Sequence, residues 1–324
     1  MLRYLARRAA NALVVALLAT SLGYLLASAA LDPLVRFRGN NPPAPPEQVH
    51  RALAAMGTDP TTPVARRLGS WLWGLARGSL GTSVDGRPVT SEIAERAWTS
   101  VQLLLLGTVL GVGLGVLVGI VGAVRQHRWF DRVTTQGSFV VLATPAFVVA
   151  VLLMVGATRL NEAAGRQLVR FTGQYTPGYD GWSGVADRAS HLLLPTLALT
   201  VGLVAAFSRY QRAAMLDVLS TDLVRGARAM GHTRRSALVR HGVRVALVPM
   251  STLAVYTGGA VLAGATITEM AFSWHGMGEY LLLAAQRGDV NAAAGTIACA
   301  AVLVLVLALV ADLLHAWLDP RVRL

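Results

Sequence analysis

The sequence predicts an all-α membrane protein with six transmembrane helices, a short helix in one cytoplasmic loop and a small extracytoplasmic segment. Apolar residues make up 54% of the 324 residues, and several apolar runs exceed the ~20 residues that cross a hydrocarbon core. Helices satisfy their own backbone hydrogen bonds, which lipid requires of any open-ended spanning structure. The predicted spans are 9–31, 99–124, 133–157, 190–210, 247–270 and 292–316.

The placement of arginines predicts the topology of these spans. All 29 basic residues are arginines, and the formal net charge is +12. Arginine-rich flanks favour the cytoplasmic side of a membrane, and they occur here at 3–8, 125–132, 209–244 and 321–323. The other connecting segments, 32–98, 158–189 and 275–291, are therefore predicted outside and both termini inside. The basic charge is a signal of topology and not of nucleic-acid binding.

Three parts are expected along the chain. They are the cytoplasmic N-terminal end with the first span (1–31), the extracytoplasmic segment (32–98) and a core of five spans with a cytoplasmic loop at 211–246 (99–324).

The outer segment is predicted to contain a helix near 47–56 and another over 64–77. The second includes Trp71 and Trp73, and we expect it to lie at the membrane surface with its aromatic rings at headgroup depth.

The composition excludes several chemistries. There is no lysine, so the Gly-x-x-x-x-Gly-Lys loop that cradles nucleotide phosphates is absent, and we do not expect this chain to hydrolyse ATP by that route. Cys299 is the only cysteine, which excludes a disulfide within the chain. The seven histidines show no metal-ligand spacing, so no metal site and no cofactor are predicted.

The most informative stretch is DLVRGARAMG at 222–231. It predicts a short helix whose start Ser220, Thr221 or Asp222 can cap. Gly231 can adopt the left-handed conformation that ends a helix.

The spacing i, i+4, i+7 places Leu223, Ala227 and Met230 on one face of this helix. A capped helix with an apolar face suits a groove on a partner protein. The alternative is a helix lying on the lipid surface, with Arg225 and Arg228 on phosphates. The residues alone do not decide between these interpretations.

Glycines and prolines mark features of helix packing within the spans. Gly107, Gly111 and Gly115 follow the small-x-x-x-small spacing that lets helices approach closely in lipid. Pro145 in the third span and Pro195 early in the fourth are expected to bend or start helices.

Glu269, beside Thr268, is the notable acid within a predicted span. A charge there is costly and indicates a candidate pathway or gate residue. Since it lies near the outer end of the span, snorkelling to the interface or pairing with a neighbour is the favoured interpretation.

With these motifs in place, the chain resembles the permease subunits of bacterial ABC importers of the dipeptide and oligopeptide class, first-permease type. The resemblance covers essentially the whole length. The segments that carry it occur in the expected order: MLRYLARR (1–8), RGSLGTS (77–83), GRPV (86–89), WFDR (129–132), TPAF (144–147), DLVRGARAMG (222–231) followed by Pro249, TEMAFSWHGMG (268–278) and LDPR (318–321).

Three positions depart from the pattern of this family. Gly226 and Met230 stand where relatives commonly have Thr and Lys, and His275 stands where they usually have Pro. Gly226 is expected to loosen its helix by roughly 1 kcal/mol relative to Ala. His275 is expected to change the shape of the outer turn.

The resemblance implies the type I importer permease fold in a bacterial plasma (inner) membrane. It implies a homologous second permease, two ABC ATPase subunits that carry ATP and Mg²⁺, an extracytoplasmic solute-binding protein and a peptide-like substrate, with membrane lipid around the spans. The short helix becomes a coupling helix that contacts an ATPase. The residues assigned to this role are Asp222, Leu223, Arg225, Gly226, Ala227, Arg228, Ala229, Met230, Gly231 and Arg235.

Two other function classes are weighed against an importer subunit. A secondary transporter needs ionisable pairs at mid-membrane and often an internal repeat, and neither is visible in the sequence. A membrane receptor fits the outer segment but gives the cytoplasmic helix no purpose.

Overall fold

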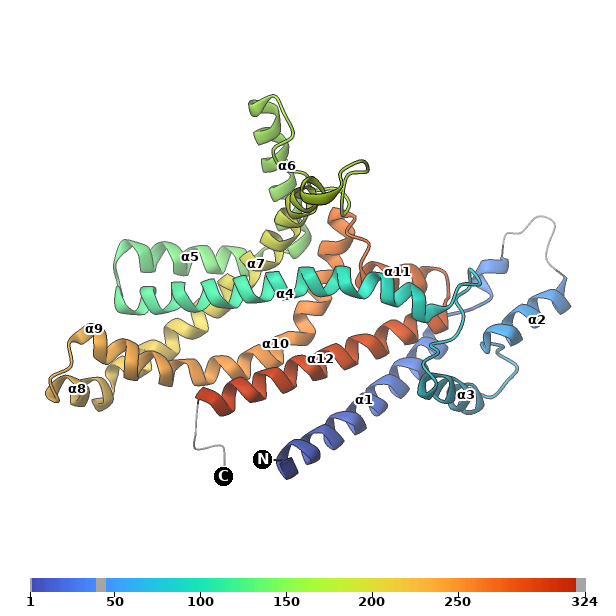
Figure 1. The fold of residues 1–324 in the computed structure, drawn as a ribbon, viewed down its shortest axis with the longest axis horizontal. Helices are drawn as coiled ribbons and strands as arrows, with labels where there is room; N and C mark the ends of the chain where they lie inside the picture. Colours follow the sequence, from blue (N-terminus) through green and yellow to red (C-terminus); the bar gives the residue numbers. More distant parts are fainter. Residues whose placement is uncertain (1, 39–44, 319–324) are drawn as a thin grey trace. The chain divides into compact units, whose positions relative to one another are not determined.

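The computed structural model describes residues 2–38 and 45–318, and that part of the chain is helical, with one isolated bridge between Thr82 and Pro88. Figure 1 shows the order of the helices. The longer helices are α1 (Leu2–Ala30), α2 (Pro46–Met56), α3 (Val64–Ala76), α4 (Val89–Val124), α5 (Trp129–Ala143), α6 (Ala146–Ala164), α7 (Gly181–Ser220), α8 (Asp222–Ala229), α10 (Val243–Phe272), α11 (Met277–Gln286) and α12 (Val290–Leu318). Shorter turns are η1 (Val35–Phe37), α9 (Arg234–Ala237) and η2 (Leu238–Gly242), the last of which is π-helical.

The chain divides into two compact units. Unit 1 contains residues 1–100 and 275–306, and unit 2 contains residues 101–274 and 307–324.

Five helical segments within the described residues are long and apolar enough to cross a membrane. They are Ala10–Ala30, Val89–Val124, Ala146–Ala164, Gly181–Ser220 and Val290–Val310. The predicted spans 9–31, 99–124, 190–210 and 292–316 each fall on one of them. The predicted span 247–270 lies within the 30-residue helix α10, several of whose side chains fall outside the described residues. A multi-pass helical membrane protein is confirmed, but the described residues contain five candidate spanning segments where six spans were predicted.

The prediction of one continuous helix over 133–157 for the third span is wrong. α5 ends at Ala143 and α6 begins at Ala146. Thr144 is extended, with ψ of 126°, because the residue before a proline is disfavoured in helical conformation. Pro145 is the N-cap of α6 and so precedes a helix start, as predicted, whereas Pro195 lies inside α7 and does not start that helix.

In unit 1, α1 and α3 pack through aromatic rings. The ring centroids of Tyr24 and Trp71 are 5.1 Å apart, and the Trp71 indole donates a hydrogen bond of 3.1 Å to the carbonyl of Leu80. The predicted helices near 47–56 and 64–77 are present as α2 and α3. Trp73 is exposed, but Trp71 is buried, so the expectation that both rings face the headgroups is wrong for Trp71.

In unit 2, three glycines of α4 lie directly against α7. A Cβ built at Gly111 would lie 2.5 Å from the Cβ of Leu203, and one at Gly115 would lie 2.7 Å from the Cβ of Phe207. Gly107 meets Leu199 in the same way, at 3.0 Å. The small-residue stripe therefore serves close packing of two helices of the same chain.

Candidate functional site

The predicted short helix is present as α8, at the tip of unit 2 beyond the ends of α7 and α10 (Figure 1). Its N-cap is Thr221, in extended conformation. No side chain caps it: the hydroxyl of Thr221 donates to the carbonyl of Val218, and that of Ser220 to the carbonyl of Asp217, each at 2.7 Å. The predicted side-chain cap is therefore wrong, because these hydroxyls satisfy the end of α7 instead.

Gly231 ends α8 as the sequence predicts. Its φ is +89°, a left-handed conformation that glycine adopts without steric cost. The N–H of His232 donates to the carbonyl of Ala227 at 3.2 Å, and the N–H of Gly231 donates to Arg228 at 3.0 Å. This pair of bonds is a Schellman motif, which satisfies the free carbonyls at the helix end and fixes the direction of the exiting chain.

α8 is anchored to its own chain by one apolar edge. Val224 and Ala227 are buried in a cluster that includes Met215 and Val218 of α7 and Leu238 of η2. The remaining residues assigned to ATPase coupling are exposed: Asp222, Leu223, Arg225, Gly226, Arg228, Ala229, Met230, Gly231 and Arg235.

The prediction that Leu223, Ala227 and Met230 share one free face is therefore wrong for Ala227. Ala227 is 2% exposed, whereas Leu223 is 44% and Met230 is 75% exposed. Residues three or four positions apart share a face of a helix, so the spacing allows Ala227 to share a face with either Val224 or Leu223. In the structure Ala227 and Val224 are buried together against α7. The free face consists of Leu223, Gly226 and Met230.

A basic hollow lies beside this face. It has a volume of about 510 Å³ and is lined by Arg225, Arg228, Ala229, Gly231, His232 and Thr233. The structure also brings the rings of His232 and His241 to 5.5 Å between centroids. Their separation of nine residues gave no signal of this contact, because His241 lies within the π-helical turn η2, which departs from α-helical spacing.

Thr268 and Glu269 are buried near the C-terminal end of α10, 3% and 1% exposed. The hydroxyl of Thr268 donates to the carbonyl of Gly264 at 3.0 Å. The burial of Glu269 excludes snorkelling of its carboxylate to the surface of this chain, which leaves pairing with a neighbour. The following turn places His275 at φ +44°, which proline cannot adopt, so this turn differs from one built on proline.

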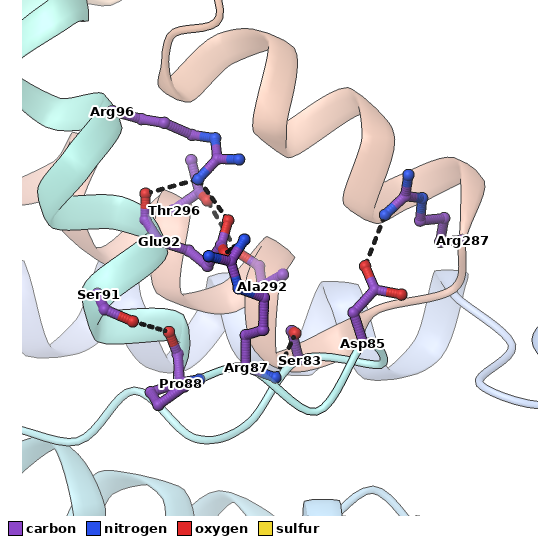
Figure 2. Close-up of polar contacts among 10 residues, drawn as sticks. All are labelled: Ser83, Asp85, Arg87, Pro88, Ser91, Glu92, Arg96, Arg287, Ala292 and Thr296. Atoms are coloured by element: carbon purple, nitrogen blue, oxygen red, sulfur yellow. Dashed lines mark hydrogen bonds and ion pairs between the residues drawn. The ribbon is translucent and has the colours of Figure 1, made fainter.

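A charged cluster in unit 1 joins the loop before α4 to α11 and α12, as Figure 2 shows. Glu92, 5% exposed, pairs with both Arg87 and Arg96. Arg287 donates to Asp85 at 2.7 Å.

Asp289 adds a buried acceptor to this cluster. Its carboxylate accepts from the N–H groups of Val84, at 2.7 Å, and Ala292, at 2.9 Å. Burial raises the pKa of this carboxyl, and these two hydrogen bonds oppose the rise. Sequence reasoning missed these contacts because they join residues about 200 positions apart.

The comparisons with known proteins agree with this architecture. Residues 111–324 match the family described as binding-protein-dependent transport system inner membrane component. The chain is 44% identical over 325 residues to the oligopeptide transport system permease protein OppB of Mycobacterium tuberculosis, which covers 100% of this chain and 99% of that protein. It is 30% identical over 295 residues to the dipeptide transport system permease protein DppB of Escherichia coli, with 86% of each chain covered.

These matches confirm the resemblance and set aside the secondary-transporter and receptor alternatives. The chain belongs to the binding-protein-dependent transport system inner membrane component family and is a multi-pass permease subunit of an ABC importer.

Proposed function

We propose that this chain forms one half of the pathway of a peptide importer and that α8 couples it to an ATPase. The observation that carries the coupling role is the split of α8 into an anchored edge and a free face. Val224 and Ala227 hold the helix on its own chain, while Leu223 and Met230 present apolar surface without cover from this chain.

The anchoring gives α8 the properties of a rigid lever. Its buried edge contacts Met215 and Val218 near the end of α7 and Leu238 of η2, which leads into α10. A force on α8 is therefore transmitted to two long helices at once. Closure of a pair of ATPase subunits would rotate the helices between inward-open and outward-open states.

The remaining partners follow from the family and from the names of the relatives. A homologous permease would supply the other half of the pathway, and a solute-binding protein would deliver a short peptide from outside. ATP and Mg²⁺ would bind to the two ATPase subunits, because this chain has no lysine for a phosphate loop. The arginine distribution supports cytoplasmic termini in a plasma (inner) membrane.

The test is recovery of ATPase subunits with tagged permease in mild detergent. Leu223→Asp and Met230→Asp place a charge on the free face, where docking would desolvate it without a partner. We expect recovery to fall by roughly tenfold or more, which is about 1.4 kcal/mol or more of binding free energy. The matched control is Val239→Asp, which adds the same charge to an exposed apolar position of the same loop.

Normal ATPase recovery with both α8 variants would overturn the docking role. It would favour the alternative, in which α8 lies on lipid and Arg225 and Arg228 bind phosphates. Because detergent removes the bilayer surface, the lipid-bound alternative predicts that both α8 variants recover ATPase subunits normally. An equal loss of ATPase recovery with Val239→Asp would also contradict specific docking through the free face of α8.

A further inference from the structure

Unit 2 contains a cavity of about 660 Å³ among α4, α5, α7 and α10. This volume lies within the range of about 300–1,000 Å³ that small-ligand pockets occupy. Its lining includes Thr134, Ser138 and Phe139 of α5, Ser208 and Arg209 of α7, and Thr257 of α10. α4 and α5 both line the cavity, and the turn between them carries Arg125 and Arg128, which predict that this turn is cytoplasmic.

Arg209 brings a positive charge to this cavity without a counter-charge. Its guanidinium carbon lies 4.1 Å from the centroid of the Phe139 ring, which holds the group in place. Among the described residues, no carboxylate lies within ion-pair distance of it. The neighbouring Arg212 differs, because its guanidinium is held by Asp131. Arg209 is thus the cation of the cavity that is free to bind an anion.

The hydroxyl groups around Arg209 are arranged as hydrogen-bond acceptors. Thr134 donates its proton to the carbonyl of Phe130 at 2.8 Å, Ser138 to Thr134 at 2.8 Å, and Thr257 to Leu253 at 3.0 Å. A hydroxyl has one proton to donate but two lone pairs. Thr134 and Thr257 are only partly buried, so with their protons directed to the backbone they offer lone pairs to a ligand, whereas the Ser138 hydroxyl is buried and lies 3.2 Å from that of Ser208.

A ligand that complements the cavity carries an anion and several N–H donors. A short peptide with a free carboxyl terminus has both, since its carboxylate suits a guanidinium and its amide N–H groups suit the hydroxyl oxygens. An anionic phospholipid provides the phosphate, but its acyl chains have no N–H donors for the hydroxyl oxygens.

We propose that this cavity binds the carboxyl-terminal end of the transported peptide. Arg209 binds the carboxylate, and the hydroxyls of α5 and α10 accept from the peptide backbone. This inference rests on the proposed function as a peptide permease, and it assigns a contact for substrate within this chain in addition to the solute-binding protein outside.

The test uses protection of a cysteine in the purified complex of both permeases with the ATPases. Cys299→Ser removes the only native thiol of the chain, and Leu142→Cys places a new thiol in the cavity lining. We expect millimolar tri-alanine to slow the reaction of this thiol with a methanethiosulfonate reagent several-fold. Tri-alanine amide, which lacks the carboxylate, should not. Leu160→Cys, exposed on α6 and away from the lining, is the control thiol.

Arg209→Gln should reduce the affinity for tri-alanine in this assay by about tenfold or more, since it removes a charge-assisted hydrogen bond. Arg209→Lys should retain part of the protection. Arg132→Gln, an exposed arginine of α5 outside the cavity, should behave as the parent protein. Recovery of ATPase subunits should be normal in all three, which separates failure of this inference from failure of the proposed function.

Equal protection by tri-alanine and its amide, or protection that survives Arg209→Gln, would overturn the proposal. Protection by phosphatidylglycerol but not by tri-alanine would also overturn it and would identify the cavity as a lipid site.

Discussion

Arg212 of α7 holds Asp131 of α5 through two hydrogen bonds, from Nε to Oδ1 at 2.5 Å and from Nη2 to Oδ2 at 2.9 Å. Asp131 is 3% exposed. It also accepts from the backbone N–H of His127 at 2.9 Å, a residue held at φ +64°. One carboxylate therefore fixes the α4–α5 turn and ties it to α7, 81 residues away.

Removing one partner of this pair should destabilise unit 2. Arg212→Gln leaves a buried carboxylate without its counter-charge, a class of change that costs about 3–5 kcal/mol. We expect a clearly lower unfolding temperature of the purified complex in detergent. The control is Arg225→Gln, which breaks the exposed Asp222–Arg225 pair of α8, where exposed pairs contribute at most about 1 kcal/mol. Equal effects of the two variants would contradict a structural role for the buried pair.

The same pair predicts a pH dependence of stability. The Arg212 hydrogen bond holds the pKa of Asp131 below its usual value of 3.8, against the opposing effect of burial. A carboxyl whose pKa is lower in the folded state stabilises the fold above its unfolded pKa, and this contribution is lost as the pH falls through the folded pKa. The stability difference between the parent protein and Asp131→Asn should therefore be constant above about pH 5 and shrink below about pH 3.8. A constant difference down to about pH 3 would refute the assigned role of ionised Asp131.

Close packing of α4 on α7 gives a prediction with an internal control. In Gly111→Ala the new Cβ would lie 2.5 Å from the Cβ of Leu203, whereas at Gly113 no atom lies within 4 Å. Overpacking of this kind costs about 1–3 kcal/mol. Gly111→Ala should lower the unfolding temperature, and Gly113→Ala should leave it unchanged or raise it, because alanine favours helix. A lower unfolding temperature for Gly113→Ala alone would contradict the packing.

Local features of this chain were predictable from the sequence, whereas its tertiary contacts were not. The long apolar runs and Gly231 encode local structure, so the spans and the end of α8 were predictable. Pro145 lies within a continuous apolar run that predicts a single helix over 133–157, so the run alone does not reveal the break between α5 and α6. The inward edge of α8 depends on Val224 meeting α7, a tertiary contact that periodicity does not encode. The pairing of Asp131 with Arg212 likewise needs the fold.

The arginine distribution predicts a topology that labelling can test. In the Cys299→Ser background, Tyr175→Cys and Met230→Cys each provide one exposed thiol, since the native side chains are 59% and 75% exposed. A membrane-impermeant maleimide added to intact cells should label position 175 and not position 230. Permeabilised cells provide the control, in which both should react. Labelling at position 230 in intact cells would contradict the cytoplasmic placement of α8 and, with it, the coupling role.

We expect the end of α8 to transmit force from a docked ATPase to α10. Gly231 has φ +89°, and a Cβ at this position would meet open space, so a substitution there strains the backbone without creating a clash. A β-branched side chain in a left-handed conformation costs on the order of 1–2 kcal/mol, and relief of this strain would release the Schellman bonds to Ala227 and Arg228. Because Leu223 and the rest of the free face remain unchanged, Gly231→Val should still recover ATPase subunits.

The looser helix end should nevertheless transmit less motion to α10. We expect proteoliposomes with Gly231→Val to hydrolyse ATP at a near-normal rate while peptide uptake falls severalfold. Gly231→Asn is the matched control, because asparagine tolerates the left-handed conformation, and it should keep most of the uptake. A parallel loss of hydrolysis and uptake in Gly231→Val would show that Gly231 supports docking of α8. Equal uptake by the valine and asparagine variants would show that the left-handed turn is not required for coupling.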